Sequence, residues 1–242
     1  MSKKNDIPST SQHTDGLHKR AIRSFVIRSG RMTEGQQKAY NDNWEFYGLD
    51  PKNGPLDYDA IFGRNAGIVL EIGFGMGKSL VEMAKNAPDK DFIGIEVHTP
   101  GVAKLMMLAA EQNVTNIRVY CHDAIEVMNH CVPKKSISCL QLFFPDPWHK
   151  KRHNKRRIVQ ASFAEKVSSL LQDGGQFHMA TDWEPYAHHM MNVMEQQLQY
   201  SNAAGAKCFY PRPTWRPLTK FEQRGETLGH GVWDLIYTKN SI

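Results

Sequence analysis

From residue 67 onward, the sequence alternates between short apolar runs and longer segments with helical composition. The apolar runs have the length and composition of buried strands and cover residues 67–73, 92–97, 117–121, 136–144 and 174–181. The segments between them predict helices at 78–87, 101–113, about 158–171 and 184–199. Strands separated by helices of this length form βαβ units and a parallel sheet covered on both faces. The sequence therefore predicts an α/β domain.

The two ends of the chain depart from this alternation. Residues 1–22 are polar, carry basic side chains and lack periodicity, so we expect a disordered basic tail before a single domain at 23–242. A short helical segment runs through Tyr40. Near the C-terminus, residues 206–211 and 232–239 fit a pair of antiparallel strands at an edge of the sheet.

Length and charge limit the class of protein further. A chain of 242 residues can bury a full α/β core. It has no apolar run of membrane-spanning length and no apolar signal segment, so we expect a soluble cytosolic protein. Its four cysteines lack C-x-x-C spacing and three of them lie in apolar stretches, which favours buried free thiols. The net charge of +5 is modest, but the positive charge is clustered, which indicates an anionic partner. The oligomeric state is not defined by the sequence, and a monomer is the working expectation.

A glycine-rich segment, Gly-Phe-Gly-Met-Gly, joins the first of these strands to its helix. Glycines such as Gly73 and Gly75 allow a tight turn and close approach of a ligand to the backbone, beside the amides of a helix N-terminus. Taken alone, this pattern suits several nucleotide ligands, and it also suits a tight turn without a ligand.

Acidic residues at the strand ends limit which ligands the glycine loop could bind. Glu71 precedes the glycines, Glu96 ends the second strand, where a carboxylate accepts from ribose, and Asp123 follows the third strand near an adenine amino group. Three carboxylates are poor neighbours for a pyrophosphate but suit a cationic cofactor. S-adenosylmethionine therefore fits better than NAD. Asp123 alone fits a helix N-cap about equally well.

A single acid follows the fourth strand in the sequence Pro145-Asp146-Pro147-Trp148. Ligands of open α/β sheets bind outside the carboxyl ends of the strands, so Asp146 lies where chemistry is expected. The flanking prolines fix φ on both sides and restrict Asp146 to extended conformations. The motif indicates a rigidly placed hydrogen-bond acceptor, although a stiff turn is the simpler alternative.

A cationic run, His-Lys-Lys-Arg-His-Asn-Lys-Arg-Arg, occupies residues 149–157. Such runs usually form a solvated face, but this one begins three residues after the expected reaction centre. Cations there would neutralise phosphates and orient a nucleic acid. The pair His149 and His153 is a poor metal site because so many cations surround it.

The acid and the cations together indicate a guanine in RNA. A carboxylate accepts two hydrogen bonds, and guanine offers two neighbouring donors, N1–H and the N2 amino group. These two hydrogen bonds leave N7, on the other side of the base, free to face a methyl donor. N7 carries a lone pair, so its methylation needs alignment and charge stabilisation rather than a general base. Trp148 or Phe144 could hold an unstacked base, or either could belong to the core.

Several motifs together resemble the bacterial tRNA (guanine-N7-)-methyltransferases. The resemblance extends from about Arg23 to Tyr237 and rests on RSFVIRSGRMTEGQQ, LEIGFGMGKSL, FIGIEVHTPGVAK, LFFPDPWHKKRHNKRR, ATDWEPYA and RPLTKFEQRGETLGHGVWDL. It implies a class I, Rossmann-like methyltransferase domain with a mostly parallel sheet and an antiparallel edge strand. It also implies an enzyme that uses S-adenosylmethionine to methylate N7 of a guanine in the variable loop of tRNA.

The resemblance also implies roles for individual residues. Asp146 matches the catalytic position. The cofactor positions, which include two loop glycines, are Glu71, Gly73, Gly75, Glu96, Asp123 and Asp146. The substrate positions are Lys150, Asp182, Thr219, Lys220, Phe221 and Glu222. The RNA-contacting positions are Arg152, His153, Asn154, Lys155, Arg156 and Arg157.

Simpler structural roles and two other classes of protein remain open from the residues alone. Thr219 and Glu222 have the spacing of a helix capping box, and Asp182 could be an N-cap. An NAD-dependent oxidoreductase would require G-x-G-x-x-G, whereas this loop reads G-x-G-x-G after an acid. An RNA-binding module without activity would not require the four acids of the expected pocket.

Overall fold

The computed structural model describes residue 24, residues 32–218, residue 222 and residues 231–241. The tail expected at 1–22 lies outside the described residues, and so do Thr219, Lys220 and Phe221.

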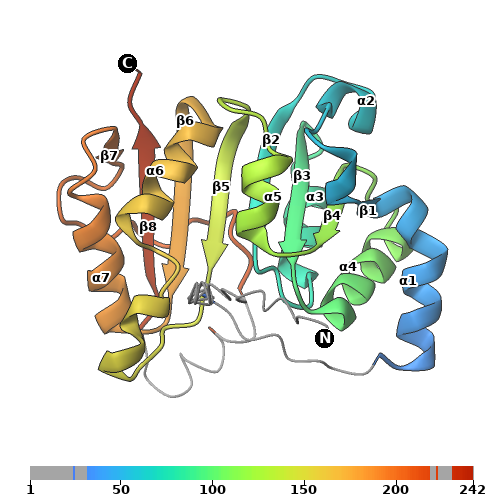
Figure 1. Cartoon of the computed structure of the whole chain (residues 1–242), viewed down its shortest axis with the longest axis horizontal. Helices are drawn as coiled ribbons and strands as arrows, with labels where there is room; N and C mark the ends of the chain where they lie inside the picture. Colours follow the sequence, from blue (N-terminus) through green and yellow to red (C-terminus); the bar gives the residue numbers. More distant parts are fainter. Residues whose placement is uncertain (1–23, 25–31, 219–221, 223–230, 242) are drawn as a thin grey trace, which may run out of the picture.

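Within the described residues, an eight-stranded sheet forms the centre of the molecule in the order β1-β4-β3-β2-β5-β6-β8-β7 (Figure 1). Its strands are β1 (Gly48–Leu49), β2 (Gly67–Ile72), β3 (Lys90–Glu96), β4 (Ile117–Cys121), β5 (Ile137–Phe143), β6 (Leu171–Thr181), β7 (Tyr200–Asn202) and β8 (Trp233–Lys239). The pairs from β1 to β6 are parallel, whereas β8 runs antiparallel to both β6 and β7.

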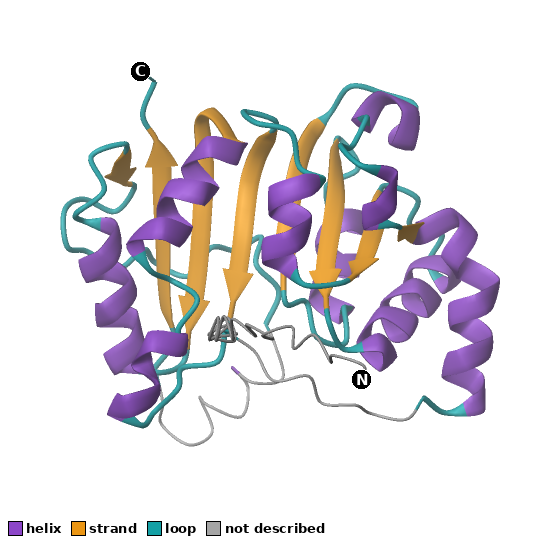
Figure 2. Ribbon diagram, viewed as in Figure 1, coloured by secondary structure: helices purple, strands orange, loops and turns teal. Residues whose placement is uncertain are grey.

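Helices cover both faces of this sheet (Figure 2). The described helices are α1 (Glu34–Tyr47), α2 (Tyr58–Phe62), α3 (Lys78–Asn86), α4 (Thr99–Glu111), α5 (Ala124–His130), α6 (Ala161–Leu170) and α7 (Glu184–Met194), with short 3-10 turns η1 (Pro51–Asn53) and η2 (Lys151–Arg156). Side chains of α1, α3 and α4 form one core with the sheet, and those of α5, α6 and α7 form another. Because both faces are covered, the central strands are almost continuously apolar.

The fold confirms the predicted mostly parallel α/β sheet, with differences near the ends. The expected strand at 206–211 is wrong, because only Tyr210 forms an isolated bridge, to Asp234. Positive φ angles at Gly205 and Lys207 turn the chain there, and an extended strand cannot form. The edge partner of β8 is instead β7, a strand of three residues. The helix expected through Tyr40 continues to Tyr47.

The strand order places a topological switch point in the middle of the sheet. After β2 the chain adds β3 and β4 on one side, then crosses to β5 on the other side of β2. The loops that follow β2 and β5 therefore leave neighbouring strands at the same edge. Open α/β sheets bind their ligands at this position.

No helix of the described residues is long and apolar enough to cross a membrane. The four cysteines are free thiols, as expected, but the expected burial is correct only for Cys131. Cys121 and Cys139 are half-buried, and Cys208 is exposed.

Candidate active site

The loop between β2 and α3 requires glycine for conformational reasons. Gly73, Gly75 and Gly77 have φ angles of 77°, 59° and 74°, in the left-handed region that other residues rarely adopt. A Cβ added at Gly73 or Gly75 would meet no described atom within 4 Å. The loop thus combines a tight turn with open space beside its backbone, as a ligand would require.

Glu96, at the end of β3, accepts hydrogen bonds from three backbone amides. Its Oε2 accepts from the Gly75 amide at 2.9 Å, and its Oε1 accepts from the Val97 and His98 amides at 2.7 and 2.9 Å. This carboxylate therefore joins the glycine loop to the start of α4. A carboxylate has about four acceptor positions, so one remains for a ribose hydroxyl.

Glu71 lies beneath the same loop and is almost completely buried, with 2% of its surface exposed. Its Oε2 has no hydrogen-bond partner among the described residues. Burial, and then the charge of Glu96, raise the pKa of Glu71 to about 8. A cation placed here would favour the ionised carboxylate and supply the missing partner.

Asp123 is the N-cap of α5, where its Oδ1 accepts from the Ile125 amide at 2.8 Å. The capping role considered for this residue is therefore correct, and the adenine role remains a prediction. The His122 amide donates to the Glu96 carbonyl at 3.1 Å, so the loop that carries Asp123 lies beside Glu96.

The loop that follows β5 presents Asp146 to solvent. The carboxylate is exposed and makes no hydrogen bond to any described residue. Phe144 and Trp148, on either side of the Pro-Asp-Pro segment, have φ angles of 50° and 49°. Left-handed backbone at such residues costs of order 1–3 kcal/mol and persists where surrounding contacts enforce it. The loop is therefore held in a strained conformation around an available acceptor.

Both aromatic neighbours of Asp146 have structural contacts. Phe144 packs against the core that α1, α3 and α4 form. Trp148 donates its indole N–H to the Ser24 carbonyl at 3.1 Å, and the Arg156 guanidinium carbon lies 3.7 Å from its ring centroid. One face of the Trp148 ring is therefore already covered by a cation.

The basic segment, residues 149–157, contains exposed, half-buried and buried residues. Four of its cations are exposed, namely Lys150, Lys151, Arg152 and Lys155, and three residues are half-buried, namely His153, Asn154 and Arg156. Arg157 is buried. Partial burial, and then neighbouring cations, lower the pKa of His153. The side of η2 that carries the exposed cations can meet an anion, but Arg157 cannot do so from its buried position.

The remaining predicted substrate residues come from β6 and the C-terminal segment. Asp182 follows β6 and is half-buried. The N-cap of α7 is Trp183, so the capping role considered for Asp182 is wrong. Trp183 lies edge-on to His149, with 4.4 Å between the ring centroids, which connects this end of β6 to the basic segment.

Glu222 lies in a buried ionic network that the sequence pattern did not indicate. Its Oε1 is 2.6 Å from Nη2 of Arg216 and 3.4 Å from Nε of Arg212. Arg216 also donates to both carboxylate oxygens of Asp234, at 2.9 and 2.8 Å, and His178 lies 2.7 Å from the same acid. Arg212, Arg216 and Glu222 are near one another in the sequence, but Asp234 and His178 belong to β8 and β6, so no local spacing reveals the whole network. Whether Thr219 caps a helix lies outside the described residues.

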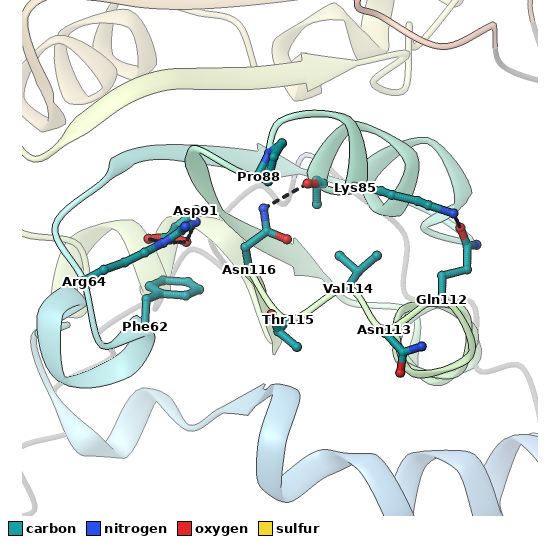
Figure 3. A pocket seen from close by; sticks show the side chains of 11 residues that line it. Phe62, Arg64, Lys85, Pro88, Asp91, Gln112, Asn113, Val114, Thr115 and Asn116 are labelled. Atoms are coloured by element: carbon teal, nitrogen blue, oxygen red, sulfur yellow. Dashed lines mark hydrogen bonds and ion pairs between the residues drawn. The ribbon is translucent and has the colours of Figure 1, made fainter.

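A separate cavity of about 350 Å³ lies where β3 and β4 begin, at the end of the sheet away from the glycine loop and the Asp146 loop. Figure 3 shows the side chains that line it. Its lining includes Arg64 and Asp91, which form an ion pair at 2.6 Å, and residues 112–116 before β4. Asn116 is anchored there by hydrogen bonds to the carbonyls of Ala84, Ala87 and Lys90. The loops at this end contain none of the predicted site residues. Within the described part of the chain, no group of three or more His, Cys, Asp or Glu side chains could hold a metal ion.

The fold is shared with other methyltransferases. The structure titled 16S rRNA methyltransferase KamB superposes with a TM-score of 0.57 at 14% identity, covering 76% of this chain and 93% of that one. The antibiotic-resistance methyltransferase Kmr gives a TM-score of 0.52 at 15% identity, covering 80% and 94% of the two chains. The sheet therefore has the Rossmann-like fold of class I methyltransferases.

Sequence comparison narrows this class. A family profile described as "Putative methyltransferase" matches residues 65–235. Proteins named tRNA (guanine-N(7)-)-methyltransferase are similar over nearly the whole chain. The one from Aeromonas hydrophila subsp. hydrophila is 60% identical over 93% of this chain and 95% of its own. The one from Escherichia coli strain K12 is 55% identical over 98% and 99%. The chain belongs to the tRNA (guanine-N(7)-)-methyltransferase family, as its motifs predicted, and the enzyme class is confirmed.

Proposed function

We propose that the protein transfers a methyl group from S-adenosylmethionine to N7 of guanine 46 in the variable loop of tRNA. The observation that carries this proposal is Asp146, an exposed acid at the switch point that makes no hydrogen bond to described residues. It lies on the loop next to the one that carries Gly73 and Gly75. Family membership supports both the methyl acceptor and the donor.

The donor pocket consists of the glycine loop and the acids around it. S-adenosylmethionine, when bound, supplies an electrophilic methyl group on a cationic sulfur. Gly73 and Gly75 leave room for close approach to the backbone. Glu71 is a buried acid whose ionised form a cation would stabilise. Glu96 accepts from ribose while it holds the glycine loop, and the Asp123 oxygen that does not cap α5 accepts from the adenine amino group.

Asp146 holds the guanine. Its two oxygens accept from N1–H and the N2 amino group, which directs N7 toward the donor pocket. The negative charge also stabilises the positive charge that develops on the ring as N7 is methylated. Lys150 and Asp182, together with the segment from Thr219 to Phe221, complete the contacts to the target nucleotide. Glu222, which is buried and paired with Arg216, supports these contacts from within the protein.

The exposed cations of the basic segment bind the tRNA backbone. Arg152 and Lys155 project from η2, which begins five residues after Asp146. Phosphate neutralisation supplies most of the affinity and fixes the orientation of the RNA, but it carries no sequence information. Selection of the guanine therefore depends on Asp146 and its neighbours. We place the reaction in domain 23–242 and in the cytoplasm.

Incubation with unmodified tRNA and methyl-labelled S-adenosylmethionine tests this function. Label should enter the tRNA, and reduction followed by aniline should break the chain at the variable-loop guanine. A tRNA with adenine at that position is the matched control and should remain unlabelled. Label in the control tRNA would contradict the proposed position, and absence of label in both would contradict the activity.

A further inference from the structure

We infer that Arg157 is a positioning residue that holds the Asp146 loop in its reactive conformation, rather than an RNA contact like its neighbours in the basic segment. This inference rests on the proposed function, because it requires Asp146 to hold the guanine.

Burial separates Arg157 from the cations that precede it. Lys150, Lys151, Arg152 and Lys155 are exposed, whereas only 6% of the surface of Arg157 is accessible. A guanidinium in that position cannot approach a phosphate without a rearrangement of the segment. Burial of a charge is costly unless specific contacts compensate for it. The contacts that Arg157 makes therefore indicate its role.

The first contact connects Arg157 directly to the loop. Its Nε donates to the Pro147 carbonyl at 2.9 Å. Pro147 immediately follows Asp146, so this hydrogen bond fixes the backbone just after the catalytic residue. A lysine lacks the Nε–H and the planar fork of arginine and cannot reproduce both this bond and a stacked arrangement.

The second contact connects Arg157 to the rigid core. Its guanidinium carbon lies 4.9 Å from the ring centroid of Tyr186, a fully buried residue of α7. The Tyr186 hydroxyl accepts from the Val159 amide at 3.5 Å. Asp146 lies close enough to add to the effect of burial in raising the pKa of Tyr186. Arg157 thus bridges α7 and the loop beside the Asp146 carboxylate.

The strained backbone of the Asp146 loop explains why the contacts of Arg157 are needed. Phe144 and Trp148 both have positive φ angles, and residues of this kind require surrounding contacts to persist in that region. The Phe144 amide donates to the Ala180 carbonyl at 2.8 Å, which fixes the beginning of the loop. The Trp148 indole and Arg157 fix its end. Without Arg157, the loop loses the hydrogen bond at Pro147 that connects its backbone, through Arg157, to Tyr186 of α7.

The test separates positioning from RNA binding by measuring two quantities on the same variants. Arg157→Ala and Arg157→Lys are compared with Arg152→Ala, which removes an exposed cation five residues away. Arg157→Ala should lower the single-turnover rate at saturating tRNA and S-adenosylmethionine by about 10- to 100-fold, with partial recovery in Arg157→Lys. The salt dependence of tRNA binding should remain parental in both Arg157 variants and become flatter in Arg152→Ala.

A double-mutant cycle with Asp146→Asn distinguishes positioning of Asp146 from a general loss of structure. If Arg157 acts through Asp146, adding Arg157→Ala to Asp146→Asn should change the rate by less than about threefold. A full additional loss in the double variant, or a flatter salt dependence in Arg157→Ala, would overturn the inference. If Arg157→Ala does not fold, Arg157→Lys in both backgrounds decides the same question. A parental rate for Asp146→Asn alone would instead contradict the proposed function.

Discussion

Glu96, at the end of β3, and Asp146, in the loop after β5, lie at the same edge of the sheet but have opposite surroundings. Glu96 accepts three backbone hydrogen bonds, from Gly75, Val97 and His98. Asp146 accepts none from the described residues and is exposed. Hydrogen bonds to a charged group contribute about 1.5–3 kcal/mol each, so Glu96 already stabilises the folded loop before any ligand binds. Asp146 keeps its acceptor capacity for a partner outside the chain.

This difference suggests different roles for the two acids. An acid whose hydrogen bonds are made within the protein shapes the cofactor pocket, whereas an acid without internal partners can bind the substrate. Substitutions should therefore affect different steps of the reaction. The predictions that follow test that difference, beginning with the largest expected effect.

Asp146→Asn should lower the rate of methyl transfer by two to three orders of magnitude, roughly 3–4 kcal/mol. The amide keeps the size of the side chain, but its NH2 group meets a guanine donor and the negative charge is lost. Affinity for tRNA should change little, because phosphates supply most of it. Stopped-time assays at saturating tRNA measure the rate, and circular dichroism checks the fold. A rate within about threefold of the parent, under 1 kcal/mol, would remove Asp146 from the reaction.

Glu96→Ala should weaken the binding of S-adenosylmethionine by about 1–3 kcal/mol and leave tRNA affinity nearly unchanged. The substitution removes the ribose acceptor and also releases the Gly75 amide. Glu96→Gln is the matched control, because the amide oxygen still accepts from part of the loop, and its loss should be smaller. Calorimetry gives both affinities. An unchanged affinity for S-adenosylmethionine in Glu96→Ala would exclude this acid from the pocket.

Glu71 should make cofactor binding depend on pH. Its folded pKa of about 8 exceeds the usual value of 4.5, so the unliganded protein holds a proton there at neutral pH. A cationic cofactor favours the carboxylate, and binding below pH 8 should release up to one proton and tighten as the pH rises. Calorimetry in buffers of different ionisation enthalpy measures this proton. Glu71→Gln should abolish the release of the proton. If the variant releases as much as the parent, the proton comes from another group.

The raised pKa of Glu71 also predicts how the free energy of unfolding changes with pH. Between about pH 4.5 and 8 the folded protein binds more protons at Glu71 than the unfolded chain, so the free energy of unfolding falls as pH rises. Glu71→Gln should flatten this decline in denaturant titrations at a series of pH values. An equal decline in the variant would show that other groups cause it.

The smallest effect is expected at the exposed cations. Arg152→Ala combined with Lys155→Ala should raise the KM for tRNA and flatten the log–log salt dependence of binding. The slope should fall by up to about 0.9 for each duplex phosphate that the variant no longer neutralises, and by less for single strands. Lys166→Ala on α6 is a control outside the basic segment. A double variant with the parental slope would show that these cations face solvent in the complex.

The sequence predicted the sheet and the positions of its acids because both follow local rules. Strand ends carry Glu71 and Glu96, and the βαβ pattern brings these ends to one edge. The burial of Arg157 and Glu222 did not follow from the sequence, because it depends on segments far apart in the chain, such as Tyr186 of α7 beside Arg157 and Asp234 of β8 beside Arg216. From the sequence alone, Arg157 is one more cation of the basic segment, and Glu222 has the spacing of a capping residue. Only the fold brings the first against Pro147 and the second against Arg216.

The backbone strain at Phe144 and Trp148 could not be predicted from the sequence either. Neither residue type favours positive φ, so the sequence carries no signal of a left-handed conformation there. The flanking prolines indicated rigidity at Asp146, but the contacts of Trp148 with Ser24 and Arg156 are tertiary. Local pattern therefore indicated the rigidity of the Asp146 loop, and long-range packing determines its shape.

The most direct test of the division between the two acids is the single-turnover rate of Glu96→Ala and Asp146→Asn as a function of S-adenosylmethionine concentration, at saturating tRNA. Glu96→Ala should approach the parental rate at high cofactor concentration, because its defect lies in binding. Asp146→Asn should reach a plateau at least about 100-fold below the parent at any concentration. Recovery of Asp146→Asn by excess cofactor would contradict the account, because Asp146 would then belong to the donor site and not to the guanine.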